Sequence, residues 1–257
     1  MTTDLTPLAA PGLAALAGIG LGVLAHAYLA PTSRAFLPMV SRADAHNNTV
    51  ALTFDDGPHP TGTPAILDIL AEHHVLAAFF VIGENARRHP DLIRRMHAEG
   101  HLVCNHSFDH ASLGSLRGPA YWLDQLRRTD NAIHDAVGLT PACFRPPWGQ
   151  KSPLMRAPLN GLGKTPIGWT RRAFDGLPTT PVRILQRLSN TRAGDVLLLH
   201  DGCPPHAHRD PAPTIAALPQ LIQHIRARGL TLARLDEHLK VPAYSRMPTG
   251  VPAGAAS

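Results

Sequence analysis

Residues 49–58, TVALTFDDGP, join an apolar run to two adjacent carboxylates and a turn. The run 49–54 is rich in apolar and β-branched residues, which predicts a buried β-strand. Asp55 and Asp56 follow where that strand would end. Neighbouring carboxylates repel each other, so a protein keeps such a pair by giving the two different surroundings or by supplying a cation. The stretch therefore predicts a polar site at the end of a buried strand.

Other apolar runs end in polar residues in the same way. His106 and His110 belong to the segment HSFDH, Arg145 opens the segment RPPWG, and His200 closes the run LLLH. In a barrel of parallel strands the carboxyl ends converge on one face, where chemistry is found. We therefore expect these side chains to meet, and several polar clusters at strand ends favour an enzyme.

Gly and Pro divide residues 46–240 into short apolar runs that alternate with longer amphipathic ones. Pro181 stands where a helix would begin, and Gly138 where one would end. Seven strand–helix alternations favour an α/β fold with a parallel sheet, either open or closed into a barrel. We expect strands at 49–54, 76–82, 101–105, 142–145, 165–169, 195–200 and 230–234, and helices at 63–73, 90–99, 119–137, 153–163, 182–192 and 214–228.

The flanking segments differ from this core. Residues 5–30 contain no Asp, Glu, Lys or Arg, and 11–30 are long enough to cross a bilayer as a helix. We expect 1–45 to form a membrane anchor and connector, with sidedness open and a secreted or soluble protein as the alternative. The tail 241–257, rich in Pro, Ala, Gly and Ser, predicts disorder.

Composition excludes some classes of protein. The net charge is +5 and the sequence pI about 9.6, which fits a basic soluble surface, with attraction to an anionic polymer or membrane as the alternative. No basic stripe interleaved with aromatic residues is present, so we expect no nucleic-acid partner. Three cysteines, Cys104, Cys143 and Cys203, make no disulfide framework; small buried thiols inside a barrel are the favoured interpretation.

One carboxylate and two imidazoles, from Asp56, His106 and His110, predict a site for one divalent metal ion. Such a set leaves positions open for water and substrate and suits Zn best, with Co, Ni or Mn as alternatives. Asp55 would then act as the base that activates water at the metal, held ionised by the metal and by Arg145.

An amide carbonyl attacked in this way needs further groups. His200 is available as the acid that protonates the departing amine. Asp175 is available to fix the tautomer of His200 and to raise its pKa. The backbone N–H groups near Trp148 are candidate donors to the oxyanion.

Four segments, TFDDGP (53–58), HSxxH (106–110), RPPWG (145–149) and LxLH (197–200), resemble the motifs of the polysaccharide deacetylases of carbohydrate esterase family four, the NodB-type domain. The resemblance covers residues 46–240. It implies a distorted, TIM-barrel-like (β/α)7 barrel, here preceded by an apolar helix. It also implies metal-dependent removal of N-acetyl or O-acetyl groups from an amino-sugar polymer, oligosaccharide or glycolipid.

The resemblance also implies roles by motif position. Asp55 looks like the base, Arg145 like the residue that tunes it, and His200 like the acid. The metal ligands implied are Asp56, His106 and His110. Leu197 and Leu199 would line a pocket for the acetyl methyl, and Trp148 would contact substrate at a position where Tyr is common.

The fourth family motif is only partly matched. Asp175 corresponds to the Asp that orients the acid, but Arg172 replaces another Asp, and Gly176 replaces a Trp that forms one wall of the sugar groove. The substrate is therefore open between an acetylated glycan or glycolipid and a small linear or cyclic amide. A non-catalytic carbohydrate-binding module is disfavoured, because base, ligands and acid are all present.

Overall fold

The computed structural model describes residues 9–245 and contains one curved sheet of parallel strands. Its strand order is β6-β5-β3-β2-β1-β8-β7, and β9 pairs with the start of β1. The strands are β1 (Thr49–Asp55), β2 (Ala78–Val81), β3 (Leu102–Asn105), β5 (Cys143–Phe144), β6 (Thr165–Pro166), β7 (Arg171–Arg172), β8 (Val196–His200) and β9 (Thr231–Leu232). Because β6 and β7 are separated only by 167–170, one short stretch of chain forms both edges of the sheet. The sheet therefore curls into the predicted barrel.

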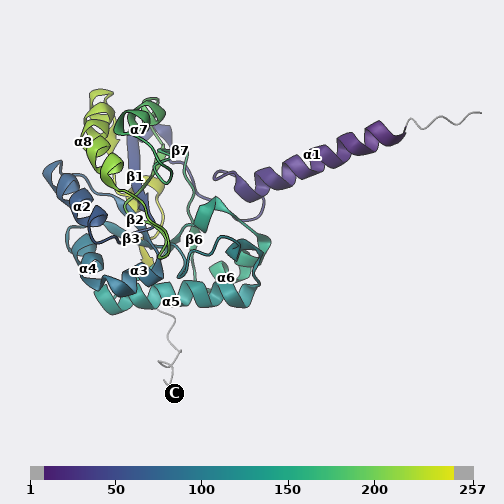
Figure 1. The fold of residues 1–257 in the computed structure, drawn as a ribbon, viewed down its shortest axis with the longest axis horizontal. Helices are drawn as coiled ribbons and strands as arrows, with labels where there is room; N and C mark the ends of the chain where they lie inside the picture. Colours follow the sequence, from purple (N-terminus) through teal and green to yellow (C-terminus); the bar gives the residue numbers. More distant parts are fainter. Residues whose placement is uncertain (1–8, 246–257) are drawn as a thin grey trace, which may run out of the picture.

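Helices surround this barrel on its outer side (Figure 1). They are α2 (Gly62–Glu72), α3 (Gly83–Arg88), α4 (Pro90–Ala98), α5 (Pro119–Val137), α6 (Arg156–Gly161), α7 (Pro181–Leu188), α8 (Ala212–Ala227) and α9 (Leu235–Leu239). The predicted helix boundaries at Pro181 and Gly138 are confirmed: Thr180 caps α7 before Pro181, and Gly138 ends α5 with a φ of 73°. Sequence patterns missed α3 and α9, which are too short to show a helical period.

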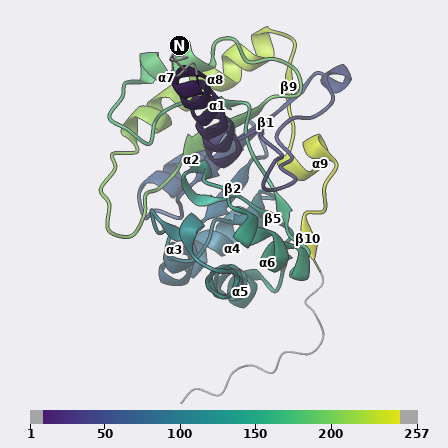
Figure 2. The same ribbon diagram turned by 90° about the vertical axis from the view of Figure 1, so that its right-hand side faces the viewer.

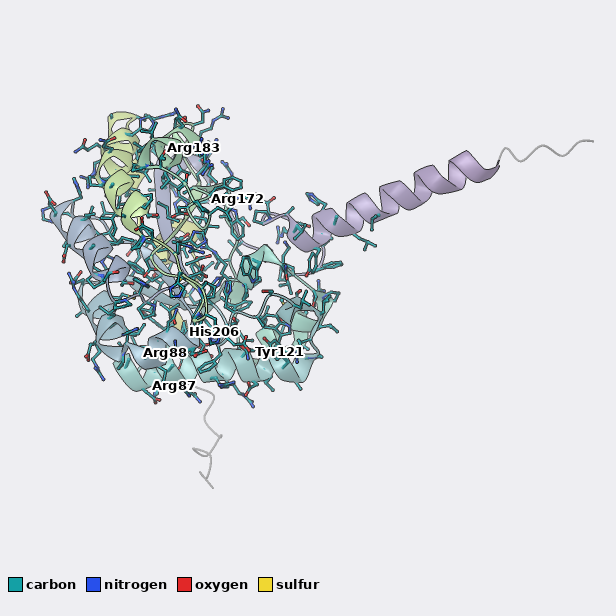
Figure 3. All side chains as sticks on the ribbon, viewed as in Figure 1. Arg87, Arg88, Tyr121, Arg172, Arg183 and His206 are labelled. Carbon is teal, nitrogen blue, oxygen red and sulfur yellow. The ribbon has the colours of Figure 1, made fainter. Side chains whose placement is uncertain are left out.

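Alternation along the strands creates two apolar layers. Phe54 and Phe79 face the helices and stack with ring centroids 5.2 Å apart. Cys104 and Cys143 belong to a second cluster inside the barrel, where both thiols are free and buried. The interior thiols were predicted from the sequence. Many charged side chains of the helices, such as Arg183 on α7, stand on the outer surface (Figure 3).

Helix α1 (Ala9–Leu29) extends away from the barrel, and only its C-terminal end contacts it (Figures 1 and 2). The Tyr28 hydroxyl lies 2.5 Å from Ser115 Oγ, and Lys151 Nζ donates to the Ala30 carbonyl at 2.8 Å. No helix within residues 9–245 is long and apolar enough to cross a membrane. The membrane anchor predicted for 11–30 stays a prediction.

The described parts of both flanking segments contact the barrel. The connector bridges to the barrel at Val40 and Arg42, which pair with residues beside β6 and β8. The prediction of disorder is wrong for 241–245, because β10 (Tyr244–Ser245) pairs antiparallel with β4 (Thr140–Pro141). The apolar residues of 241–245 pack against the barrel interior. The average composition of the whole tail, 241–257, does not reveal this packing. Residues 246–257 lie outside the described residues.

Candidate active site

The two carboxylates lie where the central strand β1 ends. Asp55 is the last residue of β1 and is in register with His200 on β8 and Phe80 on β2. Asp56 follows with a φ of 72°, a left-handed conformation that turns the chain out of the strand. The neighbouring side chains are thereby sent in different directions, and each carboxylate meets a different set of partners.

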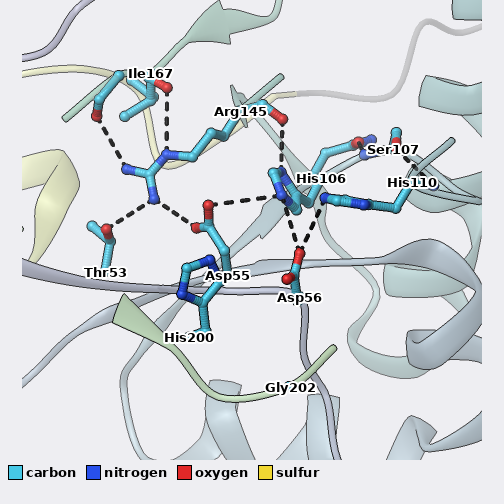
Figure 4. Close-up of polar contacts among 12 residues, drawn as sticks. Thr53, Asp55, Asp56, His106, Ser107, His110, Arg145, Ile167, His200 and Gly202 are labelled. Atoms are coloured by element: carbon cyan, nitrogen blue, oxygen red, sulfur yellow. Dashed lines mark hydrogen bonds and ion pairs between the residues drawn. The ribbon is translucent and has the colours of Figure 1, made fainter. Parts of the chain in front are cut away.

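The structure brings together the three residues predicted as metal ligands (Figure 4). One atom from each of Asp56, His106 and His110 lies within 4.8 Å of the others, and all three residues are buried. Asp56 Oδ1 is 3.1 Å from His110 Nε2 and 3.5 Å from His106 Nε2. The Nδ1–H of His106 donates to the Arg145 carbonyl at 2.8 Å, so its Nε2 lone pair faces the carboxylate.

The protonation states of this trio suit a cation. Burial lowers the pKa of His110 to about 4, so its imidazole is neutral near pH 7. Burial alone would raise the pKa of Asp56, but the imidazoles of His110 and His106 outweigh it and lower that pKa well below its usual value. Asp56 Oδ1 is buried and has no hydrogen-bond donor among the described residues. An anionic oxygen and two imidazole nitrogens therefore fit a divalent metal ion.

Asp55 is held by a buried arginine. Arg145 Nη1 donates to Asp55 Oδ1 at 2.6 Å and to Thr53 Oγ1 at 2.9 Å. The guanidinium also donates to the carbonyl oxygens of Ile167 and Gly168, and its side chain has no exposure to solvent. Asp55 Oδ2 lies 3.7 Å from His106 Nε2. Asp55 Oδ1 is thus fixed by the arginine, and Asp55 Oδ2 faces the trio of candidate metal ligands.

On the opposite side of Asp55, His200 pairs with Asp175. Asp175 Oδ1 is 2.8 Å from His200 Nδ1, and its Oδ2 accepts from the His200 amide and from Thr214 Oγ1. Burial disfavours the charged imidazole, but the Asp175 carboxylate outweighs burial and raises the pKa of His200. This arrangement keeps Nδ1 engaged and leaves Nε2 as the nitrogen that can exchange a proton.

A cavity of about 340 Å³ is lined by the trio, Asp55 and His200, together with Trp148, Trp169 and Leu198. The structure contradicts the predicted role of Leu197 and Leu199. Both are fully buried in the layer between sheet and helices, while Leu198 lines the cavity. Side chains on a strand alternate between faces, so only residues two apart share the face of His200. Counting back by two from His200 would have given Leu198.

Sequence reasoning also missed Arg209, in the loop after β8. Its Nη1 lies 3.1 Å from Asp56 Oδ2 and donates to the Gly202 carbonyl at 2.7 Å. A Cβ on Gly176 would lie 3.3 Å from Arg209 Nη2 and 3.2 Å from His200 Cε1. Space at 176 is therefore limited by the arginine and by the paired histidine, which suits glycine. No sequence signal places Arg209 here, because the intervening loop has no regular spacing.

Comparison with known proteins agrees with this fold. A family model described as polysaccharide deacetylase matches residues 42–167. The chitooligosaccharide deacetylases of Azorhizobium caulinodans and Sinorhizobium fredii are 34% and 38% identical, covering 76% and 74% of this chain and 96% and 91% of theirs. The solved family 4 carbohydrate esterase from Streptomyces lividans, in complex with acetate, is 31% identical with a TM-score of 0.68, covering 79% of this chain and 98% of its own. The chain belongs to the polysaccharide deacetylase family, as its motifs predict.

Proposed function

We propose that this protein is a metal-dependent hydrolase that removes N-acetyl groups from an amino-sugar oligosaccharide, polymer or glycolipid. Two of its relatives are named chitooligosaccharide deacetylases. The observation that carries the proposal is the convergence of the trio Asp56, His106 and His110 with Asp55 and His200 around one cavity. A binding module would need neither a buried acid–base pair nor a set of metal ligands.

The metal ion itself would be held by Asp56, His106 and His110. When bound, it supplies Lewis-acid chemistry for hydrolysis of the amide. Two nitrogen donors and one oxygen donor favour Zn²⁺ over harder ions, with Co²⁺, Ni²⁺ or Mn²⁺ as alternatives.

The reaction needs two proton transfers, and a different side chain of the cavity carries out each one. Asp55 takes a proton from the water whose oxygen attacks the acetyl carbonyl carbon, and the hydrogen bond from Arg145 orients this carboxylate. His200 gives a proton to the amine nitrogen as the carbon–nitrogen bond breaks, so acetate and a free amine are formed. Asp175 stabilises the protonated imidazole and orients it toward the leaving group.

The remaining walls would position the acetyl group. Leu198 offers an apolar surface beside His200 for the methyl group. The backbone N–H of Trp148 is the candidate donor to the developing oxyanion, and the left-handed φ of 58° at this residue shapes the turn that presents it.

Acetate release from N-acetylated chito-oligosaccharides, measured with and without a chelator, tests the proposal. We expect acetate from the sugars, loss of release on chelation, and recovery when Zn²⁺ is restored. Turnover confined to small linear or cyclic amides would support the amidohydrolase alternative. Glycan binding without acetate release would support a non-catalytic module and refute the proposed reaction.

A further inference from the structure

Arg172, at the position where the fourth motif departs from the family, stands at the rim of the active-site cavity. It belongs to β7, on the side of the barrel from which α1 emerges (Figure 3). The residue also lines a second cavity of about 510 Å³, whose wall includes Ala25, His26 and Leu29 near the end of α1. Trp148 and Trp169 line both cavities as well. Arg172 therefore sits where the two cavities adjoin.

The charge of Arg172 is not balanced by the protein. Among the cations at the active-site cavity, Arg209 pairs with Asp56, whereas Arg172 has no carboxylate within ion-pair distance in the part of the chain that the structure describes. Its guanidinium stacks over the Phe174 ring, 3.8 Å from the centroid. Stacking fixes the plane of the guanidinium and leaves its N–H edge free to bind an anion.

The surroundings of Arg172 weaken its hydration. Partial burial lowers the pKa of Arg172, because the guanidinium is partly withdrawn from water without a compensating anion. Arg172 is exposed, but it stacks on Phe174 and lines both cavities together with Trp148 and Trp169. An anion delivered by a ligand would restore the lost interaction.

The second cavity is built from fixed parts. Lys151 Nζ donates to the carbonyl oxygens of Tyr28 and Ala30, and Ser41 Oγ donates to the carbonyl of Pro31. These bonds hold the end of α1 against the barrel beside Arg172. Trp148, a residue that is 54% exposed and lines both cavities, offers an aromatic ring on which a sugar can stack.

We propose that Arg172 binds an anionic oxygen group, a carboxylate or a phosphate, on the unit next to the sugar that is deacetylated. The substrate would run from the active-site cavity past Trp148 into the cavity beside α1, so the preferred substrate is an acidic glycan or a phosphorylated sugar. This inference rests on the proposed deacetylase function and adds to it the charge of the substrate.

The test compares acetate release from three substrates of similar size. One is a neutral N-acetylated chito-oligosaccharide, one carries a carboxylate on the neighbouring unit, and one carries a phosphate ester there. Each is assayed with the wild type, Arg172→Gln, Arg172→Lys and the control Arg183→Gln, whose arginine lies on the exposed face of α7. Metal content and thermal unfolding show that each variant is folded and loaded.

We expect Arg172→Gln to lower kcat/KM on an anionic substrate by about 10- to 100-fold, mainly through KM, and to leave the neutral substrate nearly unchanged. Arg172→Lys should recover part of the loss, and Arg183→Gln should behave as wild type. The anionic substrate on which Arg172→Gln loses activity shows whether the group bound by Arg172 is a carboxylate or a phosphate. Equal effects on neutral and anionic substrates, or none, overturn the inference. No acetate from any substrate with the wild type refutes the deacetylase proposal instead.

Discussion

The pair formed by Arg145 and Asp55 makes a quantitative prediction about stability. Arg145 is fully buried, and Asp55 is 4% exposed. Replacing Arg145 with Met leaves the Asp55 carboxylate buried without its cation, and breaking a buried pair in this way costs about 3–5 kcal/mol. For a domain of this size each kcal/mol shifts Tm by roughly 2–4 °C, so we expect Tm to fall by about 6–20 °C.

A double-mutant cycle separates the ion pair from the other contacts of Arg145. Arg145→Met also removes donors from the carbonyls of Ile167 and Gly168, and that cost persists when Asp55 is changed as well. Asp55→Ala/Arg145→Met removes both charges, so we expect it to be more stable than Arg145→Met alone, with a coupling of roughly 2 kcal/mol or more. Neither the single nor the double variant should release acetate.

Urea unfolding followed by circular dichroism, with chelator present, gives these free energies. The chelator matters because a bound ion would compensate the Asp55 charge in place of the arginine. Arg145→Lys is the conservative control, since it keeps a cation but loses the planar fork. A cost below about 1 kcal/mol for Arg145→Met, or strictly additive effects in the double variant, would refute this reasoning.

Other substitutions test single groups. Asp175→Asn should remove the influence that raises the pKa of His200, so the alkaline limb of kcat moves to lower pH and kcat falls about 10²- to 10⁴-fold; an unchanged pH–rate profile would contradict the pairing. Leu198→Ala should raise KM about 10-fold, whereas Leu199→Ala should cost about 2–5 kcal/mol on unfolding and leave KM nearly unchanged; a raised KM for Leu199→Ala but not for Leu198→Ala would exclude Leu198 from the acetyl pocket. Arg209→Gln should weaken metal affinity about 10- to 100-fold in a chelator competition, and unchanged affinity would leave that arginine without a role at the metal.

Much of the fold and most of the site could be predicted from the sequence, because each catalytic motif ends an apolar run. Asp55 and His200 are brought into register by parallel pairing of β1 and β8, a geometry that follows once the strands are recognised. Two neighbouring carboxylates repel each other, which favours a bound cation beside them. This requirement predicts the metal ligands grouped around Asp56.

The failures have separate physical causes. Leu197 was placed in the acetyl pocket by motif position alone, although strand alternation turns it toward the helices. The contact between Arg209 and Asp56 depends on the path of an irregular loop, which no periodicity reveals. The tail was predicted to be disordered from its composition, but Tyr244 pairs with β4, a contact between distant parts of the chain that composition does not reveal.

The metal content of purified protein tests the central claim most directly. After dialysis to remove free metal, elemental analysis should find one equivalent of a divalent transition metal in the wild type and in Asp55→Asn, and far less in His110→Ala. Asp55→Asn should nevertheless lose nearly all acetate release. A wild type that binds no divalent ion, or His110→Ala with a full equivalent, would contradict the assignment of Asp56, His106 and His110 as the ligands.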